Sequence, residues 1–194
     1  MRLLPLGAVA VLLLLLSETP AAAPTPTPEY VAALKKMQSI EKDTAPAHST
    51  VTFSSAELNA YAKFRAAEIA PDAVRNTRLE LRNGEAAGSA LIDFVKLQKA
   101  QGQAPGRLLS WLLSGERPVT VTVRINSDNR QCQVDVLSVQ VSGVTIEGRM
   151  LDYLIENYLR PRYPDATIGE PFELRHRVEK IEVAAGRVNV RIGK

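Results

Sequence analysis

The sequence predicts an α+β fold in which a strongly curved antiparallel β-sheet wraps around amphipathic helices. Several stretches alternate apolar and polar residues with a period of two, which is typical of half-buried strands. Other stretches repeat apolar residues with the period of a helix. One long strand also changes the parity of its apolar residues between Val136 and Leu137, which requires a bulge or a strand covered on different faces. Either cause goes with a curved sheet.

The N-terminus has the features of an export signal. Met1 and Arg2 form a positive n-region, the apolar run at 3–16 is short for a membrane span, and small residues follow it. We therefore expect residues 1–23 to be a signal peptide and the protein to be exported, to the periplasm or the exterior. Pro24 disfavours cleavage directly before it, so an uncleaved N-terminal membrane anchor is the alternative.

Residues 24–49 are expected to form a linker and an N-terminal helix. Alternate prolines at 24–28 exclude a helix or a paired strand there. After them, Tyr30, Leu34 and Met37 lie at i, i+4 and i+7, which predicts an amphipathic helix over 29–42. Residues 50–194 are expected to form a single α+β domain.

This domain opens with a short strand at 50–53 and a helix whose start is well marked. Ser54 and Glu57 have the spacing of a capping box, in which each side chain bonds a backbone N–H of the first turn. The pattern predicts a helix from Ser55 to about Ala67, ending near Pro71. We expect Asn59 to be a solvated residue of this helix.

A β-hairpin is predicted at Asn83-Gly84, where both residues are expected to have positive φ. The strand before it covers 77–82 and the strand after it is expected to continue through 97. In the second strand Ala90, Ile92 and Phe94 share one face. The opposite face carries Leu91, Val95 and Leu97, and one of the two faces is expected to pack on the core while the other meets a helix or a ligand.

The segment 107–115 is the most apolar short stretch after the signal. A helix here would be apolar almost all round, with leucines at 108, 109, 112 and 113 and with Trp111 between them. Two interpretations remain open. The helix is buried on several sides, or it contacts lipid or a partner, with Trp111 suited to a membrane interface.

The rest of the chain predicts two more meanders around a helix. Strands are expected at 118–125 and 132–141, joined by a turn at 126–131. A helix follows that carries Leu151, Leu154, Ile155 and Tyr158 on one face. The last meander begins with a strand through Phe172, Leu174, His176 and Val178, and closes at a hairpin at Ala185-Gly186.

Composition excludes several classes of function. The net charge is +3 with both signs interspersed, which does not match the clustered basic face of a nucleic-acid-binding protein. It is compatible with weak attraction to an anionic membrane surface, at about 1 kcal/mol per well-placed Lys or Arg. The single cysteine, Cys132, cannot form an internal disulfide, and its position in a strand predicts a small buried hydrophobe.

Motifs for catalysis are absent from the sequence. It contains no G-x-S-x-G, no Walker loop, no G-x-G-x-x-G and no H-E-x-x-H. His48 lies in a linker, and His176 is expected to be a core or rim histidine of a strand. We therefore expect a non-enzymatic protein with no catalytic residues, no metal site and no cofactor.

The segments "FSSAELN" and "VQVSGVTIEGRML" resemble those of exported LmeA-like and related tubular lipid-binding (TULIP-like) bacterial envelope proteins. The resemblance covers most of residues 50–194. It rests on strand and cap signals without an invariant chemical group. Two departures are Glu147, where a small or proline-like residue is more usual, and the apolar segment 107–115 in place of a longer connection.

The resemblance implies a lipid-binding-like domain that holds acyl chains, or a scaffolding role in the envelope. We expect a lipid or another hydrophobic ligand to bind in a groove between the curved sheet and the helices. The residues expected to line it are Phe94, Leu108, Trp111, Leu112, Leu154 and Tyr158. The alternative is a structural or protein-interaction module of the cell envelope, with the same fold and a groove filled by its own side chains.

Overall fold

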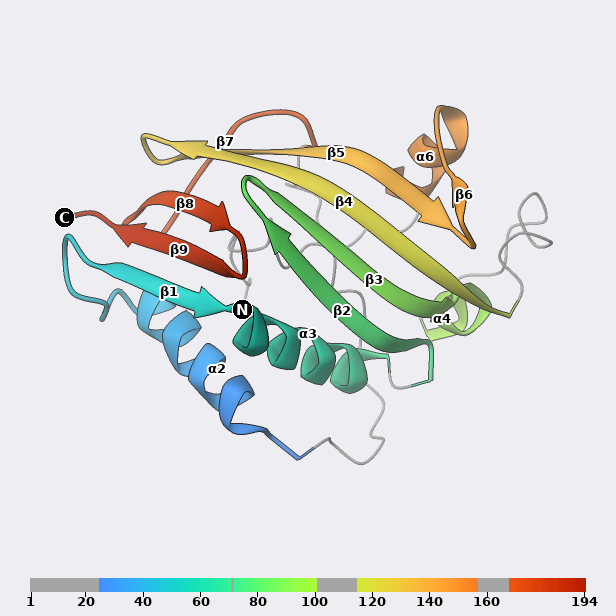
Figure 1. Ribbon diagram of the computed structural model, residues 1–194, viewed down its shortest axis with the longest axis horizontal. Helices are drawn as coiled ribbons and strands as arrows, with labels where there is room; N and C mark the ends of the chain where they lie inside the picture. The colour runs from blue at the N-terminus through green and yellow to red at the C-terminus, as the bar shows by residue number, and fades with distance from the viewer. Residues whose placement is uncertain (1–24, 71, 101–114, 157–167) are drawn as a thin grey trace.

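The computed structural model of the chain describes residues 25–70, 72–100, 115–156 and 168–194. Within these residues it confirms an α+β fold, with four α-helices and two antiparallel sheets of six and three strands (Figure 1). The expected signal peptide at residues 1–23 and the apolar segment up to residue 114 lie outside the described residues.

The larger sheet is built mainly from two long hairpins. Its main strands, in order across the sheet, are β2 (Val74–Arg82), β3 (Glu85–Asp93), β4 (Glu116–Asp128), β5 (Gln131–Val141) and β6 (Val144–Thr145). A further short strand, β7 (Phe172–Glu173), pairs with the beginning of β5. The predicted strands at 118–125 and 132–141 are confirmed, and both extend further toward the turn between them than the sequence pattern indicates.

The smaller sheet consists of β1 (Thr50–Ser54), β9 (Arg187–Ile192) and β8 (Val178–Ala184), in that order. Its edge strand β8 is joined to the larger sheet by separate hydrogen bonds. The Gly84 N–H donates to the Val183 carbonyl oxygen at 2.8 Å, and the Ile181 N–H donates to Ser127 Oγ at 2.9 Å. These bonds come from a turn and a hydroxyl, so they connect the sheets without a continuous ladder.

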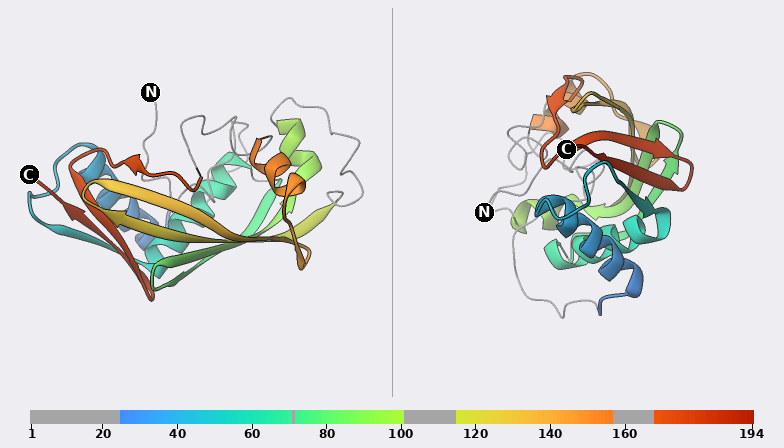
Figure 2. Two further views of the ribbon diagram at one scale, coloured as in Figure 1. Left: turned by 90° about the horizontal axis from the view of Figure 1, so that it is seen from above. Right: turned by 90° about the vertical axis from the view of Figure 1, so that its left-hand side faces the viewer.

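The helices lie on one side of the strands (Figure 2). They are α2 (Pro28–Glu41), α3 (Ser55–Ile69), α4 (Phe94–Ala100) and α6 (Arg149–Leu154). The predicted capping box of α3 is confirmed, because the Glu57 N–H donates to Ser54 Oγ at 3.2 Å and the Ser54 N–H donates to Glu57 Oε2 at 2.8 Å. The helix expected around Leu151 and Leu154 is confirmed as α6, while Tyr158 lies outside the described residues.

The parity change in β5 is a β-bulge at Leu137. Val136 lies opposite Val123 and Ser138 lies opposite Thr122, so Leu137 is an extra residue in the ladder. Because of this extra residue, apolar side chains on both sides of the bulge face the same way. The apolar residues of β5 therefore lie on the same face as those of β4 along the whole hairpin.

The main core lies between α2, α3 and the two sheets. Among its most buried side chains are Ile40 of α2, Phe53 of β1 and Leu58 of α3, together with Leu79, Val123, Cys132, Ile181, Val190 and Ile192 of the strands. Cys132 is 1% exposed, which confirms it as a small buried hydrophobe. Burial raises the pKa of its thiol to about 11. The N-terminal helix therefore shares one core with the strands that follow it.

The predicted course of β3 is wrong beyond Asp93. There the strand ends, and Phe94 begins helix α4. The Asp93 carboxylate accepts hydrogen bonds from the N–H groups of Val95 at 3.1 Å and Lys96 at 3.0 Å. This N-cap satisfies donors of the first helical turn, and it outweighs the apolar alternation that favoured a longer strand.

Two smaller expectations also differ from the structure. In the β2–β3 hairpin only Gly84 has positive φ, at 72°, and Asn83 does not. His176 lies in a turn before β8, with φ of 53°, and not within a strand. In these turns Asn83 Oδ1 accepts a hydrogen bond from the Ala185 N–H, and the Arg177 carbonyl oxygen accepts one from the Gly193 N–H.

Asn59 is half-buried and is not the solvated residue that we expected. Its carboxamide lies against β2, the edge strand of the larger sheet. Asn59 Nδ2 donates to the Leu79 carbonyl oxygen at 2.8 Å, and the Leu79 N–H donates to Asn59 Oδ1 at 2.7 Å. The amide of this one side chain thus pairs with both backbone polar groups of Leu79 on the edge strand.

Deleting Leu137 should be tolerated better than deleting Gln133 from the regular part of β5. Without Leu137, Val136 and Ser138 keep their partners on β4, so every side chain stays on its present face. Without Gln133, Cys132 changes face and would leave the core. Thermal unfolding of both deletion variants measures the difference. Equal losses of melting temperature would contradict the assignment of the bulge.

Candidate functional site

The larger sheet carries a continuous apolar surface on the face that meets the helices. Four valine or isoleucine residues of β4 occupy every second position, and each lies opposite an apolar residue of β5. The cross-strand pairs are Val119 with Val141, Val121 with Val139, Val123 with Val136, and Ile125 with Val134. We call this the inner face. Its Ile125 end belongs to the main core, and its Val119 end lies under α4 and α6.

At the Val119 end the inner face forms a second apolar cluster. Its buried members are Ala70, Ala73, Phe94, Leu97, Val119, Val139, Val141 and Ile146. Half-buried side chains around them are Val74, Ile92, Val121, Val136, Met150, Leu151, Tyr153 and Leu154. Val121 and Val136 also pack on the main core, so the two clusters are continuous along the sheet.

The two helices cover this second cluster unequally. Helix α4 contributes Phe94 and Leu97, which are 6% and 1% exposed. Helix α6 has no buried residue, and its apolar side chains Leu151 and Leu154 are only half-buried. A hydrophobic surface covered by half-buried side chains has apolar area that further contact could remove from water. This partly covered surface beside α6 is the candidate site.

Of the residues expected to line a ligand groove, two are described, and both belong to the second cluster. Phe94 lies within it, and Leu154 lies at its partly covered side. Leu108, Trp111, Leu112 and Tyr158 lie outside the described residues. Sequence reasoning missed Ile146 and Met150, because they sit in the short connection and first turn before the recognisable stripe of α6. The alternation of the two strands could have placed Val119 and Val141 in this cluster, because each shares a face with residues expected in the core.

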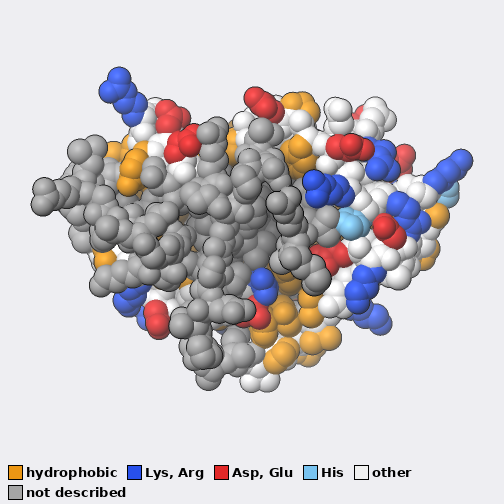
Figure 3. Space-filling view, turned by 180° about the vertical axis from the view of Figure 1, so that it is seen from behind, with side chains coloured by type: hydrophobic (Ala, Val, Ile, Leu, Met, Phe, Trp, Pro, Cys, Tyr) orange, Lys and Arg blue, Asp and Glu red, His pale blue; other side chains and the backbone are white. Residues whose placement is uncertain are grey.

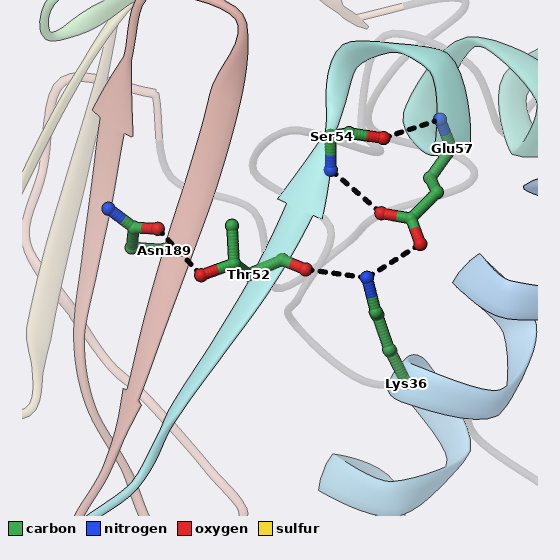
Figure 4. A network of polar contacts seen from close by, with 5 residues as sticks. All are labelled: Lys36, Thr52, Ser54, Glu57 and Asn189. Atoms are coloured by element: carbon green, nitrogen blue, oxygen red, sulfur yellow. Dashed lines mark hydrogen bonds and ion pairs between the residues drawn. The ribbon is translucent and has the colours of Figure 1, made fainter.

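A polar network holds α2, β1 and α3 together at the other end of the molecule (Figure 4). Lys36 Nζ donates to the Thr52 carbonyl oxygen at 2.7 Å and to Glu57 Oε1 at 2.6 Å. The other oxygen of Glu57 accepts the Ser54 N–H, as described for the capping box. The Glu57 carboxylate is thus bonded both to the ammonium group of Lys36 on α2 and to the backbone at the start of α3. These charge-assisted bonds link the two helices.

The electrostatics of Glu57 reflect these partners. Partial burial of the carboxyl group by itself raises its pKa, but the hydrogen bonds from Lys36 and Ser54 together outweigh burial and hold the pKa below the ordinary value of 4.5. The ionised form therefore stabilises the folded state above pH 4.5. This contribution is lost as the pH falls through the folded-state pKa.

A separate groove of about 590 Å³ lies where β8 meets the ends of β4 and β5. Amide side chains from three places line it, namely Asn83, Asn126, Gln131 and Gln133. Lys180 at its side forms an ion pair with Asp128, with Nζ and Oδ1 3.7 Å apart. Apolar residues such as Ile125, Ile181 and Val183 line it as well, and none of its lining residues belongs to the second apolar cluster beside α6.

One histidine of the described residues lies close to a carboxylate. His176 Nδ1 lies 3.8 Å from Asp43 Oδ2, in the junction between the end of α2 and the turn before β8. Within the described ranges there is no group of three or more His, Cys, Asp or Glu side chains that could hold a metal ion. Seen from the helix side, basic and acidic side chains are interspersed around the histidines (Figure 3).

No helix in the described part of the chain is long and apolar enough to cross a membrane. The chain matches no protein-family model, no curated protein and no solved structure.

Replacing Lys36 with methionine should lower the free energy of unfolding by about 1 kcal/mol at neutral pH, a modest value because water screens the partly exposed ammonium group. The loss of stability between neutral pH and the region below pH 4.5 should also shrink, because Glu57 loses the partner that depresses its pKa. Urea unfolding at several pH values measures both effects. The exposed neighbour Lys35 supplies the control, since Lys35→Met should leave the pH dependence unchanged. An unchanged pH dependence in Lys36→Met would contradict this account.

Proposed function

We propose that the protein is an exported, non-enzymatic binder of lipid or another hydrophobic ligand, which it holds between the larger sheet and helices α4 and α6. The observation that carries the proposal is the partly covered apolar surface beside α6. Four side chains of that helix pack on the inner face, and none of them is buried. Contact of these side chains with an acyl chain would remove further apolar area from water, at about 25 cal/mol per Å².

The family resemblance supports the same proposal. In LmeA-like and related tubular lipid-binding proteins, a curved sheet and helices enclose acyl chains. We propose a similarly curved sheet here, wrapped around its helices. Register shifts support it, since each bulge bends its strand locally and increases its twist. They occur at Leu137 in β5, between Arg75 and Arg78 in β2, and between Val178 and Lys180 in β8.

Export supports a lipid-binding role because a cell envelope contains lipids that must be carried through water. The signal-like residues 1–23, removed or retained as an anchor, would place the domain next to a membrane. The dispersed net charge of +3 allows only a weak attraction to an anionic membrane surface. Retention near lipid would then depend on the apolar site or on an uncleaved anchor.

The alternative is a structural or protein-interaction module of the envelope with a filled core. It is favoured by the exposed apolar side chains Leu137 and Val144, which are 41% and 55% exposed on β5 and β6. In that case the apolar side chains of α6 belong to the core of the protein and bind no ligand. The lipid content of the purified protein distinguishes the two functions.

Protein purified without detergent and extracted with organic solvent should release lipid at about one molecule per chain. It should also take up a fluorescent fatty-acyl probe. Quantitative mass spectrometry of the extract and a fluorescence titration measure these two properties. Absence of both lipid and probe uptake would overturn the proposed function and favour the interaction module.

Leu154→Ala should weaken binding of the acyl probe about fivefold, because it removes methyl groups from the partly covered surface, each worth up to about 0.8 kcal/mol. Because Leu154 is half-buried, the melting temperature of the Leu154→Ala variant should fall only moderately. Leu137→Ala is the matched control, as it removes the same atoms from an exposed position on β5. Equal probe affinity in both variants would place the ligand elsewhere.

A further inference from the structure

A single charged side chain interrupts the inner face of the central strands. Arg117 of β4 lies two residues before Val119 and opposite Ile92 of β3. Because side chains on one face of a strand recur every second residue, Arg117 shares the face of Val119, Val121 and the main core. It therefore projects on the side of the second apolar cluster.

The other described positions of this face on β3, β4 and β5 carry no charge. They are Ala86, Gly88, Ala90, Ile92, Val119, Val121, Val123, Ile125, Ser127, Cys132, Val134, Val136, Val139 and Val141. Charged residues of β4 otherwise lie on the opposite face. Arg124, for example, forms an ion pair there with Glu85, with Nη2 and Oε1 3.0 Å apart. A cation on the inner face is thus an exception to the pattern of the strand.

Arg117 is held partly out of water. The residue is half-buried, and its Nε has no significant contact with solvent. Burying a cation beside apolar side chains is unfavourable unless an anion or hydrogen-bond acceptors compensate it. Arg117 already has an interaction partner within the chain. A guanidinium group has five N–H donors, so it can bind an arriving anion in addition to that partner or in exchange for it.

Resting on the proposed function, we propose that the ligand is an anionic amphiphile, and that Arg117 binds its carboxylate or phosphate while the acyl chain lies along the second cluster. The planar guanidinium suits either group because it can donate two parallel hydrogen bonds to two oxygens. Ile92 and Val119, its neighbours on the inner face, provide the beginning of the apolar path. This assigns Arg117 a role in ligand specificity: it distinguishes charged from neutral lipids.

The test compares charged and neutral ligands of the same chain length. Palmitic acid, methyl palmitate and hexadecyl phosphate each displace a fluorescent acyl probe from the purified full-length protein. The acid should bind at least about tenfold more tightly than the ester, as expected for hydrogen bonds to a charged group. Comparison of the acid with the phosphate identifies which anion is preferred.

Arg117→Gln should remove the preference for the acid and leave the affinity for the ester unchanged. Arg117→Lys should retain part of it, since the charge remains but the two-pronged geometry is lost. Arg124→Gln, on the opposite face of the same strand, is the matched control and should keep the preference. Circular dichroism and thermal unfolding check that each variant folds.

The outcomes separate this inference from the proposed function. If the unaltered protein binds acid, phosphate and ester equally, the assignment of Arg117 is overturned while lipid binding stands, and this result needs no variant. If folded Arg117→Gln keeps its preference for the acid, the assignment is likewise overturned. If none of the three ligands displaces the probe and no lipid co-purifies, the proposed function fails, and this inference fails with it.

Discussion

One-sided burial of the long β4–β5 hairpin is the constraint on which the rest of the structure depends. The strand β4 has one apolar face from Val119 to Ile125, and its partner must present apolar residues to the same side over the same length. The extra residue Leu137 makes this possible, because it absorbs the parity change of β5 within the ladder. Without it, either Cys132 or Val141 would face solvent. The result is an inner face long enough for two groups of helices.

The two ends of that face are covered differently. At one end the inner face belongs to the main core, to which α2 and α3 contribute, and directed polar contacts fix both helices. The Lys36 and Glu57 pair ties α2 to the start of α3, and Asn59 ties α3 to the edge strand β2. At the other end α4 is anchored by its Asp93 cap, while α6 packs on the sheet with half-buried apolar side chains. The two ends of the inner face therefore differ in how closely the helices cover them.

The chemistry of the described residues agrees with this division. In the end covered by α2 and α3, the hydrogen bonds from Lys36 and Ser54 hold the pKa of Glu57 below its ordinary value. The partly covered end offers apolar area and one cation, Arg117, on the same face. In the proposed function, burial of this apolar area is the source of affinity for an amphiphile, and the charge of Arg117 is the source of selectivity.

The sequence by itself determined the local elements of this protein. The capping box at Ser54, the alternation of β4 and the parity change at Val136 and Leu137 depend on neighbouring residues, and each predicted its element correctly. Of the expected site, Phe94 and Leu154 could be named from their apolar patterns, although Phe94 was placed in a strand.

Only the tertiary structure decided what depends on partners distant in the chain. The pairing of Asn59 with Leu79, the separation of the strands into two sheets and the position of Arg117 beside the second cluster belong to this group. Asp93 lies between features set locally and features set by the tertiary structure, because the local sequence was compatible both with an N-cap and with a continuing strand. The physical reason is that periodicity and capping are set within a few residues, whereas register and burial are set by whichever surfaces meet on folding.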